Sequence, residues 1–316
     1  MDLVVPFSAW VVLGVTVVAM VAIDLFSHRG DHNGSRRTAI VWSLVWVGVA
    51  LAFGGVVTAW FGRAAGEQYL AAYLLEKSLS IDNLFVFVLV FTALGIPSLQ
   101  QRRVLTWGIF GAFAMRGLFV WLGLATLERW HSAVFVFGGL LVIAGLKLLR
   151  PSEHPSEPKI VPWLVKHLPW TRRLHGNKFV VKLAGKWVAT PLLVALIAIE
   201  LADVMFAVDS LPAAFAVTSV PFLVYSSNLF ALLGLRALFS VIGDLLIRLR
   251  YLHYGLAAVL LFAGAKMILG PWIAVAPLMS VLVIADIIAV AIIASVLAAR
   301  RDRKAGAAVA PVSGVS

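Results

Sequence analysis

The sequence contains no cysteine and few charged residues. Of its 316 residues only 13% are charged, whereas a soluble domain usually carries about 25%. Without cysteine the chain forms no disulfide scaffold, no thiolate metal site and no redox-active Cys-x-x-Cys motif. The low charge and a hydrophobic fraction of 62% exclude both an ordinary soluble domain and a disordered chain. The composition is typical of a polytopic membrane protein.

Long apolar segments make up most of the chain. A helix needs roughly 20 mostly apolar residues to cross the bilayer core, and we find about nine such segments. The alternating pattern of a membrane β-barrel, over about 10 residues per strand, is absent. We therefore predict an all-α fold with about nine transmembrane helices, in a single domain over about residues 1–300. The predicted spans are residues 6–26, 39–60, 68–95, 104–127, 131–149, 189–217, 222–247, 251–269 and 274–298.

The basic residues are concentrated in alternate loops. With nine spans, most of the 26 Lys and Arg residues fall on one side of the membrane, and only Arg63 and Arg129 fall in loops on the other. Because Lys and Arg favour the cytoplasmic side, we predict a bacterial cytoplasmic (inner) membrane protein with its N-terminus outside and its C-terminus inside. The basic loop 150–188 and a short tail, 301–316, are then cytoplasmic. Topology thus explains the net charge of +11, and nucleic acid is not an expected partner.

Two sets of three predicted spans share the same landmarks. The third and sixth spans each contain two acids six positions apart, the second followed by a polar residue: Glu76, Asp82 and Asn83 in one, Asp203, Asp209 and Ser210 in the other. The later spans carry matching segments, Arg116-Gly-Leu-Phe with Arg236-Ala-Leu-Phe and Ala144-Gly-Leu-Lys147 with Ala263-Gly-Ala-Lys266.

Matched spans are three apart in the chain, so they cross the membrane in opposite directions. We predict an inverted repeat of three-helix units, spans 3–5 (about residues 68–149) and spans 6–8 (about residues 189–269). Inverted repeats of this kind are common in secondary transporters, which bind their substrate near the bilayer midplane where the repeats meet.

The intramembrane acids are costly, at about 2.5–3.5 kcal/mol each near a helix centre, and persist where they pair or line an ion path. At 100° per residue, Asp82 lies about 120° around its helix from Glu76. Either the helices unwind locally, or Asp82 and Asp209 face other partners such as Arg116 and Arg236. Proline at 212 removes the helical partner of the Val208 carbonyl, which would suit cation coordination.

The available ligands are hard oxygen atoms, because the histidines fall in loops or at span ends. Carboxylate, amide and hydroxyl oxygens suit Mn²⁺, Ca²⁺ or Mg²⁺. The Met205 sulfur would favour Mn²⁺ slightly. The alternative is that the acids form structural ion pairs with cations in the spans. The candidates for such pairs are Arg116, Arg236, Lys77, Lys147 and Lys266.

The two acidic motifs, Glu76-Lys-Ser-Leu-Ser-Ile-Asp82-Asn83-Leu-Phe and Thr190-Pro-Leu…Glu200-Leu-Ala-Asp203-Val-Met-Phe-Ala-Val-Asp209-Ser210-Leu-Pro212, resemble those of the TerC family of integral membrane proteins. The likeness runs over about residues 5–300, and the Glu-Lys form of the first motif is most similar to the Alx-like branch. The resemblance implies metal-ion export, with manganese and the alkaline pH response linked to that branch. It implicates as metal ligands Glu76, Asp82, Asn83, Glu200, Asp203, Asp209 and Ser210.

We therefore expect a secondary transporter that exports Mn²⁺ by alternating access. In this hypothesis Asp82, Asp203 and Asp209 hold the substrate ion, while the other four implicated residues complete or gate its shell. Protons are the expected counter-substrate, because carboxylates must lose their protons to bind a metal. No ATP-binding GxxxxGK[ST] motif, permanent cofactor or enzymatic nucleophile–base pair is expected.

Two alternatives stay open. One is a transporter of another small solute, such as an amino acid. The other is a non-transporting membrane scaffold for a metal- or tellurite-stress complex, whose acids are salt bridges. The sequence does not set the oligomeric state.

Overall fold

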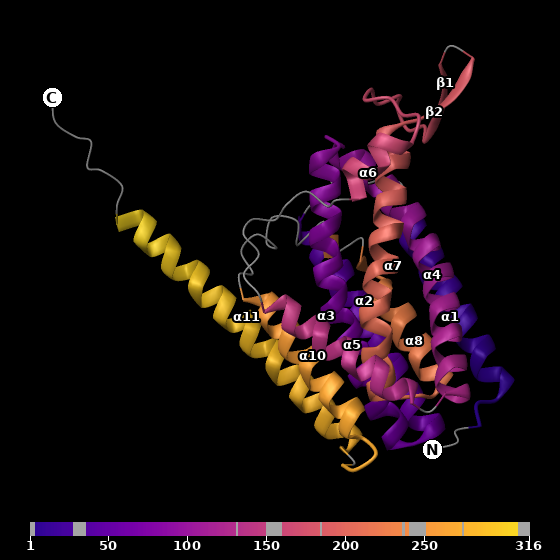
Figure 1. The fold of residues 1–316 in the computed structure, drawn as a ribbon, viewed down its shortest axis with the longest axis vertical. Helices are drawn as coiled ribbons and strands as arrows, with labels where there is room; N and C mark the ends of the chain where they lie inside the picture. The colour runs from indigo at the N-terminus through magenta and orange to yellow at the C-terminus, as the bar shows by residue number, and fades with distance from the viewer. Residues whose placement is uncertain are drawn as a thin grey trace.

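The computed structural model describes a bundle of long helices with a small β-hairpin at one end (Figure 1). The described residues are 4–27, 36–130, 132–149, 160–183, 185–235, 238–239, 251–273 and 275–308. The helices are α1 (Phe7–Ser27), α2 (Arg36–Phe61), α3 (Arg63–Ala93), α4 (Ser98–Arg129), α5 (Ala133–Leu148), α6 (Ile160–His167), α7 (Pro191–Val217), α8 (Pro221–Leu232), α10 (Leu252–Leu269) and α11 (Pro277–Ala308).

Each predicted span overlaps a helix of the described chain. Helices α1, α2, α4, α7 and α11 are long and apolar enough to cross a membrane, while α5, α8 and α10 are apolar but shorter. Helix α3 has 31 residues but carries several charges. The expectation of a helical, polytopic membrane protein is therefore supported, and the crossing of all nine helices stays a prediction.

The predicted span 222–247 is not one helix, which corrects the expectation. Helix α8 ends at Leu232, and Gly234 then adopts a φ of +80°, a left-handed conformation that costs glycine little. The Lys77 ammonium group donates to the carbonyls of Ala231 (3.1 Å) and Leu233 (3.4 Å) at this end. A cation at the negative end of the helix dipole satisfies carbonyls that lie inside the bundle.

Helices α3 and α7 are continuous, so local unwinding, one of the two alternatives for the acidic helices, is not observed. Helix α7 runs unbroken through Pro212. Packing against neighbouring helices lets a buried helix tolerate an internal proline. On a continuous helix, positions six residues apart lie about 120° apart around the axis.

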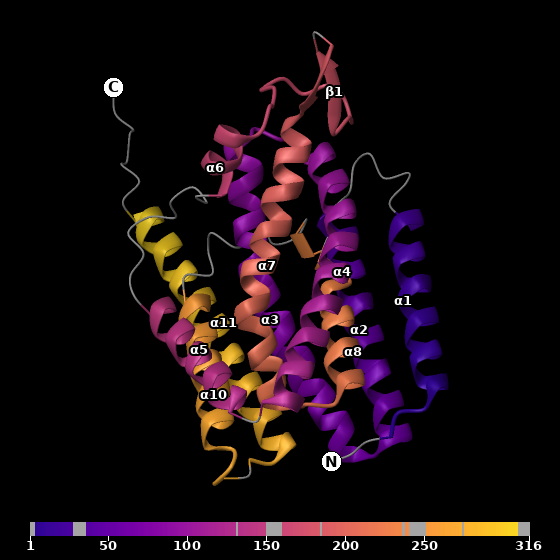
Figure 2. The ribbon, with the colours of Figure 1, turned by 45° about the vertical axis from the view of Figure 1, so that its right-hand side comes forward.

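The loop 160–188 combines α6 with a hairpin of β1 (Val180–Leu183) and β2 (Lys186–Ala189), paired antiparallel with Lys182 opposite Trp187. The hairpin and α6 lie at one end of the bundle and the N-terminus at the other (Figures 1 and 2). We call these the hairpin end and the N-terminal end. Helix α4 begins at the hairpin end, where the Gln100 side chain donates to the Gly176 carbonyl (2.9 Å).

Helices α3 and α7 occupy the middle of the bundle (Figure 2). Helix α3 packs against α2, α7, α8 and α11, and α7 packs against α3, α4, α5 and α10. The pairs α3–α8, α4–α7 and α5–α10 are thus all in direct contact. Charged residues carried by α3, α4 and α7 are consequently brought together at the centre.

Helices α5 and α10 meet through a reciprocal glycine contact. A Cβ added at Gly138 would lie 3.2 Å from the Gly264 carbonyl, and one at Gly264 would lie 2.9 Å from the Gly138 carbonyl. Seven residues along, a Cβ at Gly145 would lie 3.0 Å from the Ala257 carbonyl. The two helices therefore run antiparallel at van der Waals distance, which only small residues permit.

This contact predicts that Gly138→Val lowers the midpoint of thermal unfolding in detergent. The added side chain would meet Ile268 and the Gly264 backbone, and overpacking of this kind costs about 1–3 kcal/mol. The matched control is Gly139→Val on the same helix, because nothing lies within 4 Å of the added Cβ there. Equal midpoints for the two variants would contradict the prediction.

Candidate functional site

A cluster of buried polar side chains lies at the centre of the bundle. Its members come from four helices and are at most 4% exposed: Glu76 and Asn83 from α3, Arg116 from α4, Asp203 from α7 and Asn228 from α8. Charged groups are rarely buried this completely unless they are paired.

The Arg116 guanidinium group lies between two carboxylates. Its Nη1 donates to the Glu76 carboxylate and to Asn228 Oδ1 (2.5 Å), and its Nη2 lies 3.7 Å from Asp203 Oδ1. The Asn83 amide also donates to Asp203 Oδ1 (3.3 Å). The planar guanidinium fork with several donors suits this role better than an ammonium group does.

Several buried side-chain oxygens of α3 and α7 have no hydrogen-bond partner among the described residues. They are Oε1 of Glu76, Oδ2 of Asp203 and the hydroxyls of Ser80, Ser210 and Tyr73. An unsatisfied buried polar group costs about 1–3 kcal/mol. Each of the two paired acids thus keeps one oxygen available to accept a hydrogen bond or to contact a cation.

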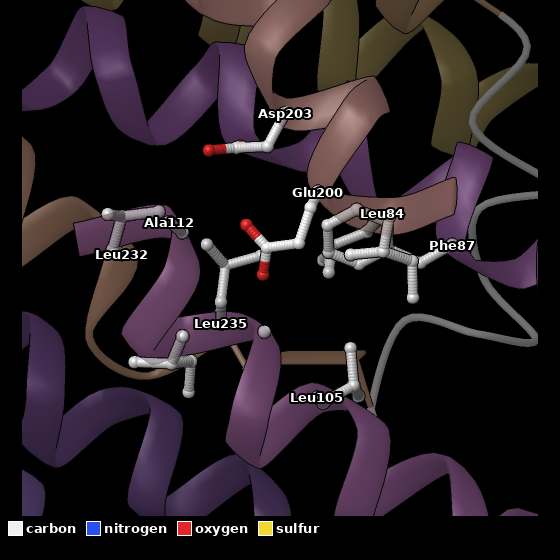
Figure 3. A pocket seen from close by; sticks show the side chains of 11 residues that line it. Leu84, Phe87, Leu105, Ala112, Glu200, Asp203, Leu232 and Leu235 are labelled. Atoms are coloured by element: carbon white, nitrogen blue, oxygen red, sulfur yellow. The ribbon is translucent and has the colours of Figure 1, made fainter. Parts of the chain in front are cut away.

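A small pocket with a cavity volume of about 30 Å³ adjoins the cluster, and Asp203 and Glu200 of α7 are its two acids (Figure 3). The Glu200 carboxylate projects among Leu84, Leu105 and Leu235, and its Oε1 has no described partner. The pocket lies on the hairpin-end side of Asp203, because Glu200 is closer than Asp203 to the start of α7.

Glycines of α4 make room for Glu200. The nearest atom to a Cβ added at Gly108 is Glu200 Oε1 (3.7 Å), whereas a Cβ at Gly111 would overlap the carboxylate itself. Gly111 therefore sets how far Glu200 extends into the pocket. The sequence analysis did not identify Gly111, although the spacing of Gly108 and Gly111 on a charged span is a signal for close helix approach.

Three of the seven implicated residues, Glu76, Asn83 and Asp203, meet in the cluster, and Glu200 lies in the adjoining pocket. Ser210 is buried on α7. The side chains of Asp82 and Asp209, and the whole of Arg236, lie outside the described residues. Among the residues that are described, no three acidic, His or Cys side chains are arranged to hold a metal ion.

Sequence reasoning missed Asn228 and Tyr73. Asn228 holds Arg116 through its Oδ1, while its own amide donates to the Val224 carbonyl (3.0 Å). The signal was the polar run Ser226-Ser227-Asn228 inside an apolar span. Intramembrane polar residues of this kind usually face the bundle interior.

Apolar helices packed around a buried charge cluster define a polytopic helical membrane protein. Within that class, the chain belongs to the TerC family: the Integral membrane protein TerC family model matches residues 61–303. The resemblance carried by the two acidic motifs is thereby confirmed at the level of the family.

Relatives cover most of the chain. A membrane protein of Myxococcus xanthus, STKORF319, is 42% identical over 288 residues, which is 90% of each chain. A protein of Escherichia coli K12 named as a candidate membrane-bound redox modulator, Alx, is 37% identical over 274 residues, 82% of this chain and 85% of the relative. A membrane protein of Rickettsia felis is 33% identical over 293 residues, 92% and 97% of the two chains. No solved structure matches the chain.

Proposed function

We propose that the protein is a secondary transporter that exports a hard divalent cation, Mn²⁺ above all, from the bacterial cytoplasm. The observation that carries the proposal is the pocket in which the carboxylates of Glu200 and Asp203 adjoin the Glu76–Arg116 pair. In a purely structural network each carboxylate would be paired with a cationic side chain. Here the carboxylates of Glu76 and Asp203 share one guanidinium group, and the Glu200 carboxylate lies in the adjoining pocket. One oxygen of each of these three acids has no described partner.

The charge balance favours a dication. When ionised, Glu76, Asp203, Glu200 and Arg116 together carry a net charge of −2, which one divalent cation or two protons would neutralise. Exchange of the ion for two protons would leave these four residues neutral overall at both stages of the cycle, which avoids the high cost of an unpaired charge among them. Protons are therefore the proposed counter-substrate.

In the proposed mechanism Asp203 and Glu200 receive the ion from the hairpin end. Asp82 and Asp209, with Asn83 and Ser210, would complete its oxygen shell near the midplane. Glu76, held by Arg116 in this structure, would bind or release the ion as that pair breaks. No permanently bound cofactor and no enzymatic activity belong to the proposal.

Alternating access would follow from the inverted repeat, which two features of the packing support. In the repeat, α3 is equivalent to α7 and α4 is equivalent to α8. The contact of α3 with α8 is therefore equivalent to the contact of α7 with α4, and both are observed. In addition, the contacts between α5 and α10 follow the repeat. If Gly145 is aligned with Gly264, Gly138 is aligned with Ala257, and the contact of Gly145 with Ala257 is then equivalent to the contact of Gly264 with Gly138. The hairpin end, rich in Lys and Arg, would face the cytoplasm, with the N-terminus outside.

The test is Mn²⁺ flux through purified protein in liposomes. We expect Glu200→Gln to reduce the flux strongly, since it removes the pocket carboxylate while keeping the size of the side chain. The matched control, Glu67→Gln, alters an acid paired with the exposed Arg63 near the start of α3, 2.9 Å away, and should leave the flux unchanged. Equal fluxes in both variants and in the unaltered protein would refute the assignment.

A non-transporting scaffold is the second candidate, because Arg116 pairing with Glu76 and Asp203 is also what a structural salt bridge would look like. The Escherichia coli relative is named a redox modulator, and in this chain the absence of cysteine excludes a redox role through thiols. The activity of the double variant Arg116→Leu with Glu76→Leu distinguishes a scaffold from a transporter.

A further inference from the structure

The pocket lies on one side of the charge cluster only. Helix α3 contributes Leu84 and Phe87, which come after Glu76 in the chain, and helix α7 contributes Ile199 and Glu200, which come before Asp203. Because α3 and α7 point in opposite directions, all four lie toward the hairpin end.

The two acidic motifs define a counterpart for each of these residues. Aligning Glu76, Asp82 and Asn83 with Asp203, Asp209 and Ser210 fixes the register of α3 on α7. The counterparts of Leu84, Phe87, Ile199 and Glu200 are then Leu211, Ala214, Ala72 and Tyr73, respectively. These lie on the other side of the cluster, toward the N-terminal end.

In this structure the counterpart positions are buried. Ala72, Tyr73, Leu211 and Ala214 are all at most 4% exposed. The helices are also bound to each other at the N-terminal end, where the Thr218 hydroxyl after α7 donates to Gln68 Oε1 of α3 (2.7 Å). Of the four, Leu211 also lines a hollow between α4, α5 and α7, whose described lining contains no charged residue.

The buried hydroxyl of Tyr73 is the second observation. It has no hydrogen-bond partner among the described residues, whereas the nearby Tyr69 hydroxyl donates to the Ala50 carbonyl (3.0 Å). An unpaired buried hydroxyl costs free energy of folding. The residue aligned with Tyr73 in the other repeat is Glu200, the acid that projects into the pocket. The present packing gives the Tyr73 hydroxyl no role.

We infer that Ala72, Tyr73, Leu211 and Ala214 line a second passage, which connects the cluster to the N-terminal end when the pocket at the hairpin end closes. The Tyr73 hydroxyl then contacts the passing cation where Glu200 contacts it on the opposite side. A neutral hydroxyl binds a hard dication more weakly than a carboxylate does, which suits uptake at the hairpin end and release at the other. The inference rests on the proposed transport function and names its exit path.

Single cysteines test this passage cleanly, because the chain has none of its own. In proteoliposomes, Ala72→Cys and Ala214→Cys should react with a membrane-impermeant maleimide added on the side of the N-terminal end. Their adjacent controls, Ala71→Cys and Ala213→Cys, replace equally buried alanines that the alignment does not place on the passage. We expect the passage positions to react at least about tenfold faster, since even a minor open state exposes them.

Two further variants keep the result interpretable. Ile199→Cys in the pocket should react from the side of the hairpin end, and Thr218→Val should speed labelling at Ala72→Cys by removing the bond to Gln68. The inference is overturned if Ile199→Cys reacts while Ala72→Cys and Ala214→Cys stay unlabelled, or if all four alanine positions react alike.

Mn²⁺ flux is measured in the same vesicles. Flux without labelling at Ala72→Cys and Ala214→Cys would overturn the proposed second passage but not the proposed transport function. Labelling without flux would support the passage and remove Mn²⁺ as the substrate.

Discussion

Replacing Arg116 by leucine is expected to destabilise the protein severely. The change would leave the carboxylates of Glu76 and Asp203 buried together with no cation between them. Removing one partner of a buried ion pair costs about 3–5 kcal/mol, a large part of the stability of a typical protein. We expect a sharp loss of folded protein, measured as the monodisperse yield in detergent and the midpoint of thermal unfolding.

The matched control is the double variant Arg116→Leu with Glu76→Leu. The second change removes one of the two uncompensated carboxylates and leaves that of Asp203, so folding should recover in part. The same variant separates the two functions: a scaffold would recover its activity, whereas a transporter would stay inactive because a carboxylate of the ion path is missing. Normal stability of Arg116→Leu alone would show that the cluster does not hold the four helices together.

Asp203→Asn is expected to reduce Mn²⁺ flux by at least about 100-fold, the upper range for loss of a group that supports a metal ligand. Asp203 belongs to both the pocket and the charge cluster, and its Oδ2 has no described partner. Asparagine keeps the shape of the side chain but removes the charge that a cation requires.

The control for this variant is Asp286→Asn. Asp286 is an acid of the predicted last span, but it is exposed on α11 and away from the cluster. Its replacement should leave the flux within about twofold of the unaltered protein. An equal loss in both variants would place the ion path elsewhere.

The sequence predicted the helices well, because apolar length is a local property and the bilayer sets the required length. It also identified the acids of α3 and α7, since a charge inside an apolar span is conspicuous without any knowledge of its neighbours. The break after α8 was missed, because Gly234 ends a helix there only through its left-handed conformation and the contact of Lys77 from α3. A hydropathy pattern contains neither feature.

Composition and hydropathy by themselves determined that this chain is a helical membrane protein with charged central helices, and the two acidic motifs indicated its family. Only the tertiary structure decided that Arg116 pairs with Glu76 and Asp203, that Asn228 joins them and that Gly111 makes room for Glu200. The physical reason is that helical periodicity fixes which residues share a face of one helix. Which faces meet depends on the packing of helices that are far apart in the chain.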